Sequence, residues 1–212
     1  IIGRPRKDPT FDLRPLAPMA PSANICPDRS ASGSTRWRSA DAASALPGDP
    51  VLAGWLTHAG SLTRRLQALG PGEFTLEVIG EGMEPAARED AALLGTDDRS
   101  LYSRRIRLRV RGQALVQACT LAPEATVIQH PWLRDLGGKP LGAALADRAG
   151  VRRTSFEFAL IRPDHEGEPP ALRDLPRGHG PCAGRRSRFF VADAPILVYE
   201  FFLPPLLEFG PP

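Results

Sequence analysis

The stretch GRRSRFFVADAPILVYEFFLP, residues 184–204, decides the fold of this chain. It predicts two antiparallel strands, residues 186–191 and 196–203, joined by a turn at residues 192–195. The second strand is almost wholly apolar and rich in β-branched and aromatic residues, which is typical of a buried strand. The hairpin therefore indicates a core built on a sheet.

Glu200 interrupts this apolar strand. Alternation places it on the same face as Ile196, Val198 and Phe202. An ionised carboxylate in an apolar core costs several kcal/mol unless a partner compensates it. Two interpretations are open. Glu200 forms a structural ion pair or reaches water at a strand end, or it is the polar group of an apolar ligand pocket.

Length and charge exclude several classes of protein. The chain has 212 residues, enough for one domain with a sizeable core, and 24% of them are charged. The net charge of +3 is mild; it suits a small anionic ligand and does not require nucleic acid. Cys26, Cys119 and Cys182 are odd in number and far apart, so they predict neither a zinc site nor a disulfide framework, and we expect a reducing cytoplasm.

The first 33 residues differ from the rest. They are rich in Pro, Ser, Ala and Arg without lasting periodicity. We expect a disordered N-terminal extension or sequence translated from upstream of the true start, with a transit peptide as a third option. The folded domain is then expected to span residues 34–212. The sequence contains no run of about 18 apolar residues, so it predicts no membrane span.

Two helices are predicted next. Asp49 and Pro50 supply an N-cap and a first helical position, and Gly60 ends that helix. Ser61 caps a second helix, which Gly70 ends.

A run of arginines marks the next informative strand, residues 103–111. Alternation puts four of them on one face, which we interpret as solvated: Arg105, Arg107, Arg109 and Arg111. Arg104 falls with Ile106, Leu108 and Val110 on the apolar face. Arg104 therefore either curls out to water at the strand start, or needs an anionic partner such as Glu200 or a ligand carboxylate.

The remaining pattern completes an α+β fold. Strands are predicted at residues 74–78, 113–121 and 153–161, and a short helix at 141–149. Residues 81–95 are interpreted as mobile with at most a short helix, residues 124–139 as a loop, and residues 163–183 as a long loop. The count is six strands in one antiparallel sheet with helices at the front and middle. No standard catalytic or metal-binding motif occurs.

Five segments, in order, resemble the chorismate pyruvate-lyase family. They are residues 55–66 (WLTHAGSLTRRL), the strand around Arg104, residues 136–142 (LGGKPLG), residues 153–158 (RTSFEF), and residues 184–188 (GRRSR) running on to 200–204 (EFFLP). The resemblance implies a six-stranded antiparallel sheet with helices closing over an internal ligand pocket. It also implies cofactor-independent conversion of chorismate to 4-hydroxybenzoate and pyruvate, the first committed step of ubiquinone biosynthesis.

The resemblance also implies roles for four residues. Arg104 binds the ring carboxylate and Glu200 the ring hydroxyl, while main-chain groups of Leu62 and Leu141 complete the pocket. Glu200 acts as the general base or only orients the hydroxyl, and both roles stay open. Either Arg185 or Arg186 is expected to meet the enolpyruvyl carboxylate, because alternation allows only one of them to point inward.

Two rival functions remain. One is a non-catalytic effector-binding domain of the same fold; the other is a DNA-reading helix-turn-helix protein using Arg64 and Arg65. The preferred interpretation is a cytoplasmic monomer that binds chorismate and 4-hydroxybenzoate and uses no metal, nucleic acid or stable membrane insertion.

Overall fold

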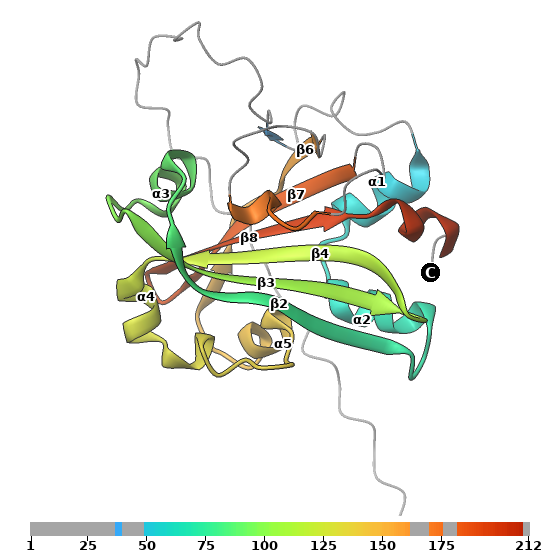
Figure 1. Cartoon of the computed structure of the whole chain (residues 1–212), viewed down its shortest axis with the longest axis horizontal. Helices are drawn as coiled ribbons and strands as arrows, with labels where there is room; N and C mark the ends of the chain where they lie inside the picture. The colour runs from blue at the N-terminus through green and yellow to red at the C-terminus, as the bar shows by residue number, and fades with distance from the viewer. Residues whose placement is uncertain (1–36, 40–48, 162–169, 176–181, 210–212) are drawn as a thin grey trace, which may run out of the picture.

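The structure is a computed structural model, and it describes residues 37–39, 49–161, 170–175 and 182–209 (Figure 1). The expected extension, residues 1–33, lies outside the described residues. So does most of the predicted loop at 163–183.

One antiparallel sheet dominates the fold, and within the described residues it has eight strands, where six were predicted. Their order is β1-β6-β7-β8-β4-β3-β2, and β5 pairs with β7 beside this path. The strands are β1 (Arg38–Ser39), β2 (Phe74–Pro85), β3 (Ser100–Val110), β4 (Gln113–Ala122), β5 (Val151–Arg153), β6 (Glu157–Ile161), β7 (Cys182–Val191) and β8 (Ala194–Phe202). The predicted α+β class with an antiparallel sheet is confirmed.

Two strand predictions were wrong in extent. The strand expected at residues 153–161 is split into β5 and β6, and both pieces pair with β7. Strand β2 continues to Pro85, through residues interpreted as mobile. A register shift between Val78 and Gly80 explains the broken alternation there. Gly80 is needed because a Cβ at that position would collide with the Arg105 guanidinium.

The first two helices begin as predicted. The Asp49 carboxylate accepts hydrogen bonds from the N–H groups of Val51 and Leu52, and the Ser61 hydroxyl accepts one from Arg64 N. The helices are α1 (Pro50–Thr57), α2 (Leu62–Leu69), α3 (Arg88–Leu94), α4 (Glu124–Gln129) and α5 (Leu141–Ala146), with 3₁₀ turns η2 (Pro131–Leu133), η3 (Pro170–Leu172) and η4 (Pro204–Phe209). Helix α4 replaces part of a predicted loop.

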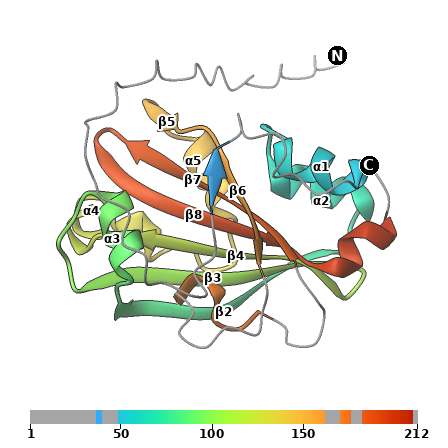
Figure 2. The same ribbon diagram turned by 90° about the horizontal axis from the view of Figure 1, so that it is seen from above.

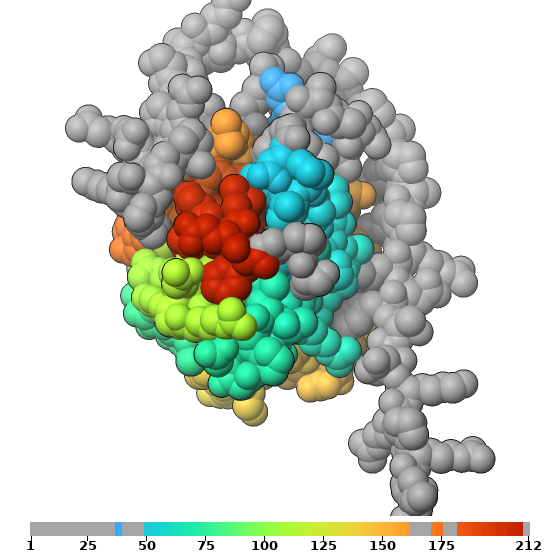
Figure 3. Space-filling view, turned by 90° about the vertical axis from the view of Figure 1, so that its right-hand side faces the viewer, coloured from blue at the N-terminus to red at the C-terminus, as the bar shows by residue number. Residues whose placement is uncertain are grey.

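The helices divide between the two faces of the sheet. One face carries two apolar clusters. In the first, Trp55 and Leu56 of α1 and Leu62 and Leu66 of α2 pack with Ile106 of β3. In the second, Leu141 and Leu145 of α5 pack with Tyr102, Leu136 and Ile196. Figure 2 shows α1 and α2 grouped above one end of the sheet. The opposite face packs against α3 and η3 through Leu94, Leu121, Leu172 and Tyr199. Turn η4, red in Figure 3, lies beside α1, cyan, and closes the end of the first cluster.

The arginine pattern predicted that the opposite face is solvated, but part of that face is covered. Arg105 is only 7% exposed. It forms ion pairs with Glu84, and with Asp174 at 2.9 Å. The prediction of a solvated side chain was wrong for Arg105, because residues 170–175 fold over it. Arg109 and Arg111 do lie near solvent, paired with Glu77 and Glu73.

Removal of the Arg105 side chain is therefore expected to destabilise the fold. Arg105→Ala leaves Glu84 inside the protein without its main cation, which should lower the free energy of unfolding by about 3 kcal/mol. Arg109→Ala on the same strand breaks only an exposed pair and should cost less than about 1 kcal/mol. Urea unfolding of both variants measures the difference. Equal losses would show that the Arg105 ion pairs add nothing beyond a surface contact.

Candidate active site

The candidate site occupies the face of the sheet that carries α1, α2 and α5. Strand register aligns Arg104, Thr120, Val198 and Ser187 in one row across β3, β4, β8 and β7. The next row is Ile106, Ala118, Glu200 and Arg185. Because directly paired residues point to the same face, Arg104 and Glu200 share it. They stand about 10 Å apart across two strands and about 7 Å apart along them.

Small side chains lie between these two charges. On β4, Thr120 neighbours Arg104 and Ala118 neighbours Glu200. Val198 and Glu200 remain partly accessible although strands flank β8 on both sides. The helices thus leave the middle of this face incompletely covered. The small side chains between one cation and one carboxylate suit a flat ring lying against the sheet.

Arg104 is 1% exposed, which confirms that it points inward. Its Nη2 donates to the carbonyl oxygens of Gly137, at 2.6 Å, and Lys139, at 3.3 Å. Its Nε is buried and has no hydrogen-bond partner among the described residues. The loop before α5 thus fixes one edge of the guanidinium, and the Nε still requires an acceptor.

Glu81 lies beside Arg104 and was not predicted from the sequence as a site residue. It pairs directly with Arg104 across β2 and β3, and its Oε2 lies 3.8 Å from Arg104 Nε. The Tyr102 hydroxyl donates to the other oxygen of Glu81, at 2.7 Å. Burial lowers the pKa of Arg104, whereas the charge of Glu81 raises it. Glu81 therefore offsets part of the cost of burying this cation.

Glu200 is paired, but not with Arg104. Its Oε2 accepts a hydrogen bond from Arg185 Nε at 2.5 Å, and the two residues are directly opposite in the β7–β8 hairpin. Glu200, one of the anionic partners expected for Arg104, therefore pairs with Arg185 instead, and Arg104 lies beside Glu81. Arg185 is 1% exposed, and the Glu200 side chain is 19% exposed. Glu200 is the member of the pair that a ligand can reach.

Arg185 joins Glu200 to the end of α1. Its Nη1 lies 3.2, 3.0 and 2.8 Å from the carbonyl oxygens of Trp55, Leu56 and His58. The last carbonyls of a helix lack intrahelical partners, and a cation there is favourable. The pairing compensates the buried guanidinium and fixes the α1–α2 turn beside Glu200.

Arg186 points the other way, as alternation requires. It forms ion pairs with Glu89 and Glu157, each at 2.6 Å, on the face of α3. Arg186 is therefore excluded from the face that carries Glu200, and of the two neighbouring arginines only Arg185 is on it.

Leu62 and Leu141 begin helices α2 and α5 and are each 7% exposed. The first N–H groups of a helix have no acceptor within the helix, so they are available to a ligand. The structure places the two helix starts in the two clusters that flank the candidate site. This arrangement suits the main-chain contacts expected of both residues.

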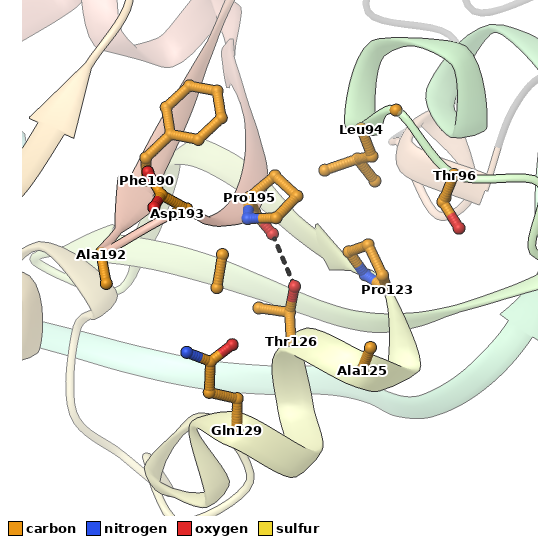
Figure 4. A pocket seen from close by; sticks show the side chains of 12 residues that line it. Leu94, Thr96, Pro123, Ala125, Thr126, Gln129, Phe190, Ala192, Asp193 and Pro195 are labelled. Atoms are coloured by element: carbon orange, nitrogen blue, oxygen red, sulfur yellow. Dashed lines mark hydrogen bonds between the residues drawn. The ribbon is translucent and has the colours of Figure 1, made fainter.

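A separate hollow of about 540 Å³ lies at the β7–β8 turn, between α4 and the end of α3 (Figure 4). Its described lining contains Asp193, Thr126 and Gln129 but no arginine or lysine. Thr126 donates to the Pro195 carbonyl there, at 3.2 Å. An anionic ligand would find no cation in this hollow, so it is a poor candidate for the site.

The described residues offer little to other chemistries. They contain no group of three or more His, Cys, Asp and Glu side chains placed to hold a metal ion. Across the same ranges, every helix is too short or too polar to cross a bilayer. Cys119 is buried, and burial raises the pKa of its thiol to about 12.

Comparison with known proteins decides the family. Residues 32–208 match the profile described as "Chorismate lyase". The chain belongs to the chorismate lyase family. The match covers the sheet, both helical groups and all four predicted site residues. The chain is accordingly a lyase of this family.

Several relatives in the chorismate lyase family support the assignment. A "Probable chorismate pyruvate-lyase" of Methylococcus capsulatus is 38% identical over 156 residues, which is 73% of this chain and 95% of that protein. One from Burkholderia pseudomallei is 37% identical, covering 71% of this chain and 81% of the relative. Among solved structures, the PhnF C-terminal domain aligns at 18% identity and a TM-score of 0.49, covering 69% of this chain and 94% of that domain.

Proposed function

We propose that this protein converts chorismate to 4-hydroxybenzoate and pyruvate. One observation carries the proposal. A buried arginine, Arg104, whose Nε has no hydrogen-bond partner among the described residues, shares a sheet face with a reachable carboxylate, Glu200, in a chorismate lyase family member. Chorismate has a ring carboxylate para to a ring hydroxyl, so a cation and a carboxylate separated on one sheet face match its two ends.

The reaction requires the substrate to be held in the right position and needs few chemical steps. The bond between ring C3 and the ether oxygen breaks, the C4 proton leaves, and the ring becomes aromatic. The electron pair of the C3–O bond departs with the enolpyruvyl group, which takes up a proton at its methylene carbon and becomes pyruvate. Aromatisation supplies the driving force, so the protein must hold the dianion and stabilise the leaving group.

We assign the substrate contacts as follows. Arg104 binds the ring carboxylate through its Nε edge, which has no hydrogen-bond partner among the described residues, and its other edge stays on the carbonyls of Gly137 and Lys139. Glu200 accepts from the ring hydroxyl and removes the C4 proton. The main chain at Leu62 and Leu141 closes the two sides. No metal or cofactor enters this scheme.

The product 4-hydroxybenzoate fits a role in ubiquinone biosynthesis, as the first committed step. We propose that the protein carries out this step in the cytoplasm, as a monomer. A strain that lacks its own chorismate lyase tests the pathway role: expression of this chain should restore ubiquinone, measured in lipid extracts. No restoration, with active protein present in the cells, would remove the pathway assignment.

The activity itself is tested with purified protein and chorismate. Pyruvate, followed by coupled NADH oxidation, and 4-hydroxybenzoate, followed by chromatography, should appear in equal amounts. The variant Arg109→Ala, which removes a half-exposed arginine paired with Glu77 on the opposite face, is the matched control and should act like the wild type. A protein that binds 4-hydroxybenzoate but releases no pyruvate would instead be an effector-binding domain.

A further inference from the structure

A second arginine, Arg153, converges on the Glu200 end of the site. It ends strand β5 and pairs directly with Phe189 of β7, which places it on the same face as Arg185 and Glu200. Its Nη2 donates to the Ala59 carbonyl at 3.0 Å, next in the chain to the His58 carbonyl that Arg185 contacts. Both guanidinium groups thus meet the α1–α2 turn.

The two guanidinium groups also share one aromatic ring. The Cζ of Arg153 lies 4.4 Å from the centre of the Phe156 ring, and that of Arg185 lies 4.2 Å from it. Two like charges are therefore close together on a partly apolar surface. Such an arrangement is unfavourable unless anions balance it.

The negative charge described at this end of the site does not balance the two arginines. Glu200 already pairs with Arg185 at 2.5 Å. Within the described residues, no carboxylate lies at ion-pair distance from Arg153; its contacts there are the Ala59 carbonyl and the rings of Phe156 and Phe189. Burial, and then the charge of Arg185, lower the pKa of Arg153, while Glu200 opposes them. One further anion would restore the balance.

The proposed substrate brings such an anion to this place. In chorismate the enolpyruvyl ether is attached at C3, next to the C4 hydroxyl that Glu200 is assigned to bind. Its carboxylate can therefore reach the Glu200 end of the site. We propose that Arg153 binds the enolpyruvyl carboxylate of chorismate. This assignment rests on the proposed function, and it replaces the expectation that Arg185 or Arg186 does so.

The structure argues against both of those alternatives. Arg186 is on the opposite face with Glu89 and Glu157. Arg185 gives its Nε to Glu200 and its Nη1 to the end of α1. Arg153, in contrast, is held by a single carbonyl, on a side chain that keeps partial access to solvent. It can turn its charge toward a ligand without breaking an ion pair.

Product binding distinguishes a contact with the enolpyruvyl carboxylate from a contact with the ring, because 4-hydroxybenzoate has lost the enolpyruvyl group. Arg153→Ala should raise the KM for chorismate about 10- to 100-fold, the effect expected for one charged hydrogen-bonded contact. The Kd for 4-hydroxybenzoate, measured by calorimetry, should stay within about twofold of the wild-type value. Arg153→Lys should recover most of the lost KM, because the charge returns.

Arg152 supplies the matched control. It is the neighbouring residue, exposed, and paired with Asp193 at 3.0 Å on the other face. Arg152→Ala should leave KM and Kd unchanged. If Arg153→Ala proves unstable by circular dichroism, Arg153→Gln keeps a donor for the Ala59 carbonyl without the charge and should show the same KM effect.

Two results would overturn the inference while leaving the function intact. One is a KM for chorismate that Arg153→Ala does not change. The other is a Kd for 4-hydroxybenzoate that weakens as much as KM rises. A wild-type protein that releases no pyruvate would instead defeat the proposed function, so the two failures are distinguishable.

Discussion

Glu200→Gln is expected to lower kcat about 10²- to 10⁴-fold while 4-hydroxybenzoate still binds. Glutamine keeps the volume and one acceptor, so Arg185 Nε retains a partner, but the side chain can no longer take a proton. One Glu200 oxygen accepts from Arg185, and we assign the other to the substrate. Steady-state kinetics with chorismate and calorimetry with 4-hydroxybenzoate make the test.

The size of the effect tests the proposed role of Glu200 as the general base against a role that only orients the ring hydroxyl. A fall of about tenfold, with product binding weakened in step, would mean that Glu200 only orients the ring hydroxyl. Wild-type kcat together with wild-type product affinity would remove Glu200 from the site. Glu77→Gln, which changes an exposed partner of Arg109, is the control and should affect neither quantity. The melting temperature of each variant shows whether the Arg185 ion pair matters to stability.

Short-range patterns explain what could be predicted from the sequence. The N-cap residues Asp49 and Ser61 mark real helix starts, because capping is decided by neighbours within three residues. The inward direction of Arg104 follows from the two-residue period of a strand. The same period separates Arg185 from Arg186. Each of these predictions needs only residues close together in the chain.

The partner of Glu200 was missed because the turn predicted at residues 192–195 was wrong in length. A four-residue turn at residues 192–195 would place Glu200 opposite Ser187. The structure instead has a two-residue turn, with Val191 paired to Ala194 and a positive φ at Ala192, so Arg185 faces Glu200. A shift of two residues keeps the face but changes the partner. The sequence therefore predicted the face and not the ion pair.

The neighbours of Arg104 and Arg153 were missed for a different reason. Gly80 and Gly82 made residues 81–85 look irregular, yet β2 continues there and brings Glu81 beside Arg104. The contact of Arg153 with Ala59 joins residues 94 positions apart. No local pattern carries such long-range information. The charge surplus around Glu200 becomes visible only when β5, β7, β8 and the α1–α2 turn are assembled.

Arg104→Ala is expected to weaken the binding of both the substrate and the product, whereas Arg153→Ala should weaken only the binding of the substrate. Both ligands keep the ring carboxylate, and the loss of a desolvated guanidinium contact should cost roughly 2–4 kcal/mol, about 30- to 1,000-fold in KM and in Kd. Arg104→Lys should recover only part of this loss, because an ammonium group cannot reproduce the planar fork of donors. Kinetics with chorismate and calorimetry with 4-hydroxybenzoate measure the two effects in parallel.

The control for Arg104 must separate binding from folding, because its Nη2 also holds the carbonyls of Gly137 and Lys139. Arg109→Ala on the same strand removes an arginine from the opposite face and should change neither KM nor Kd. Equal effects from the two alanine variants would contradict the alternation argument. A higher KM for chorismate with an unchanged Kd for 4-hydroxybenzoate would move Arg104 from the ring carboxylate to the enolpyruvyl group, and would exchange its role with that of Arg153.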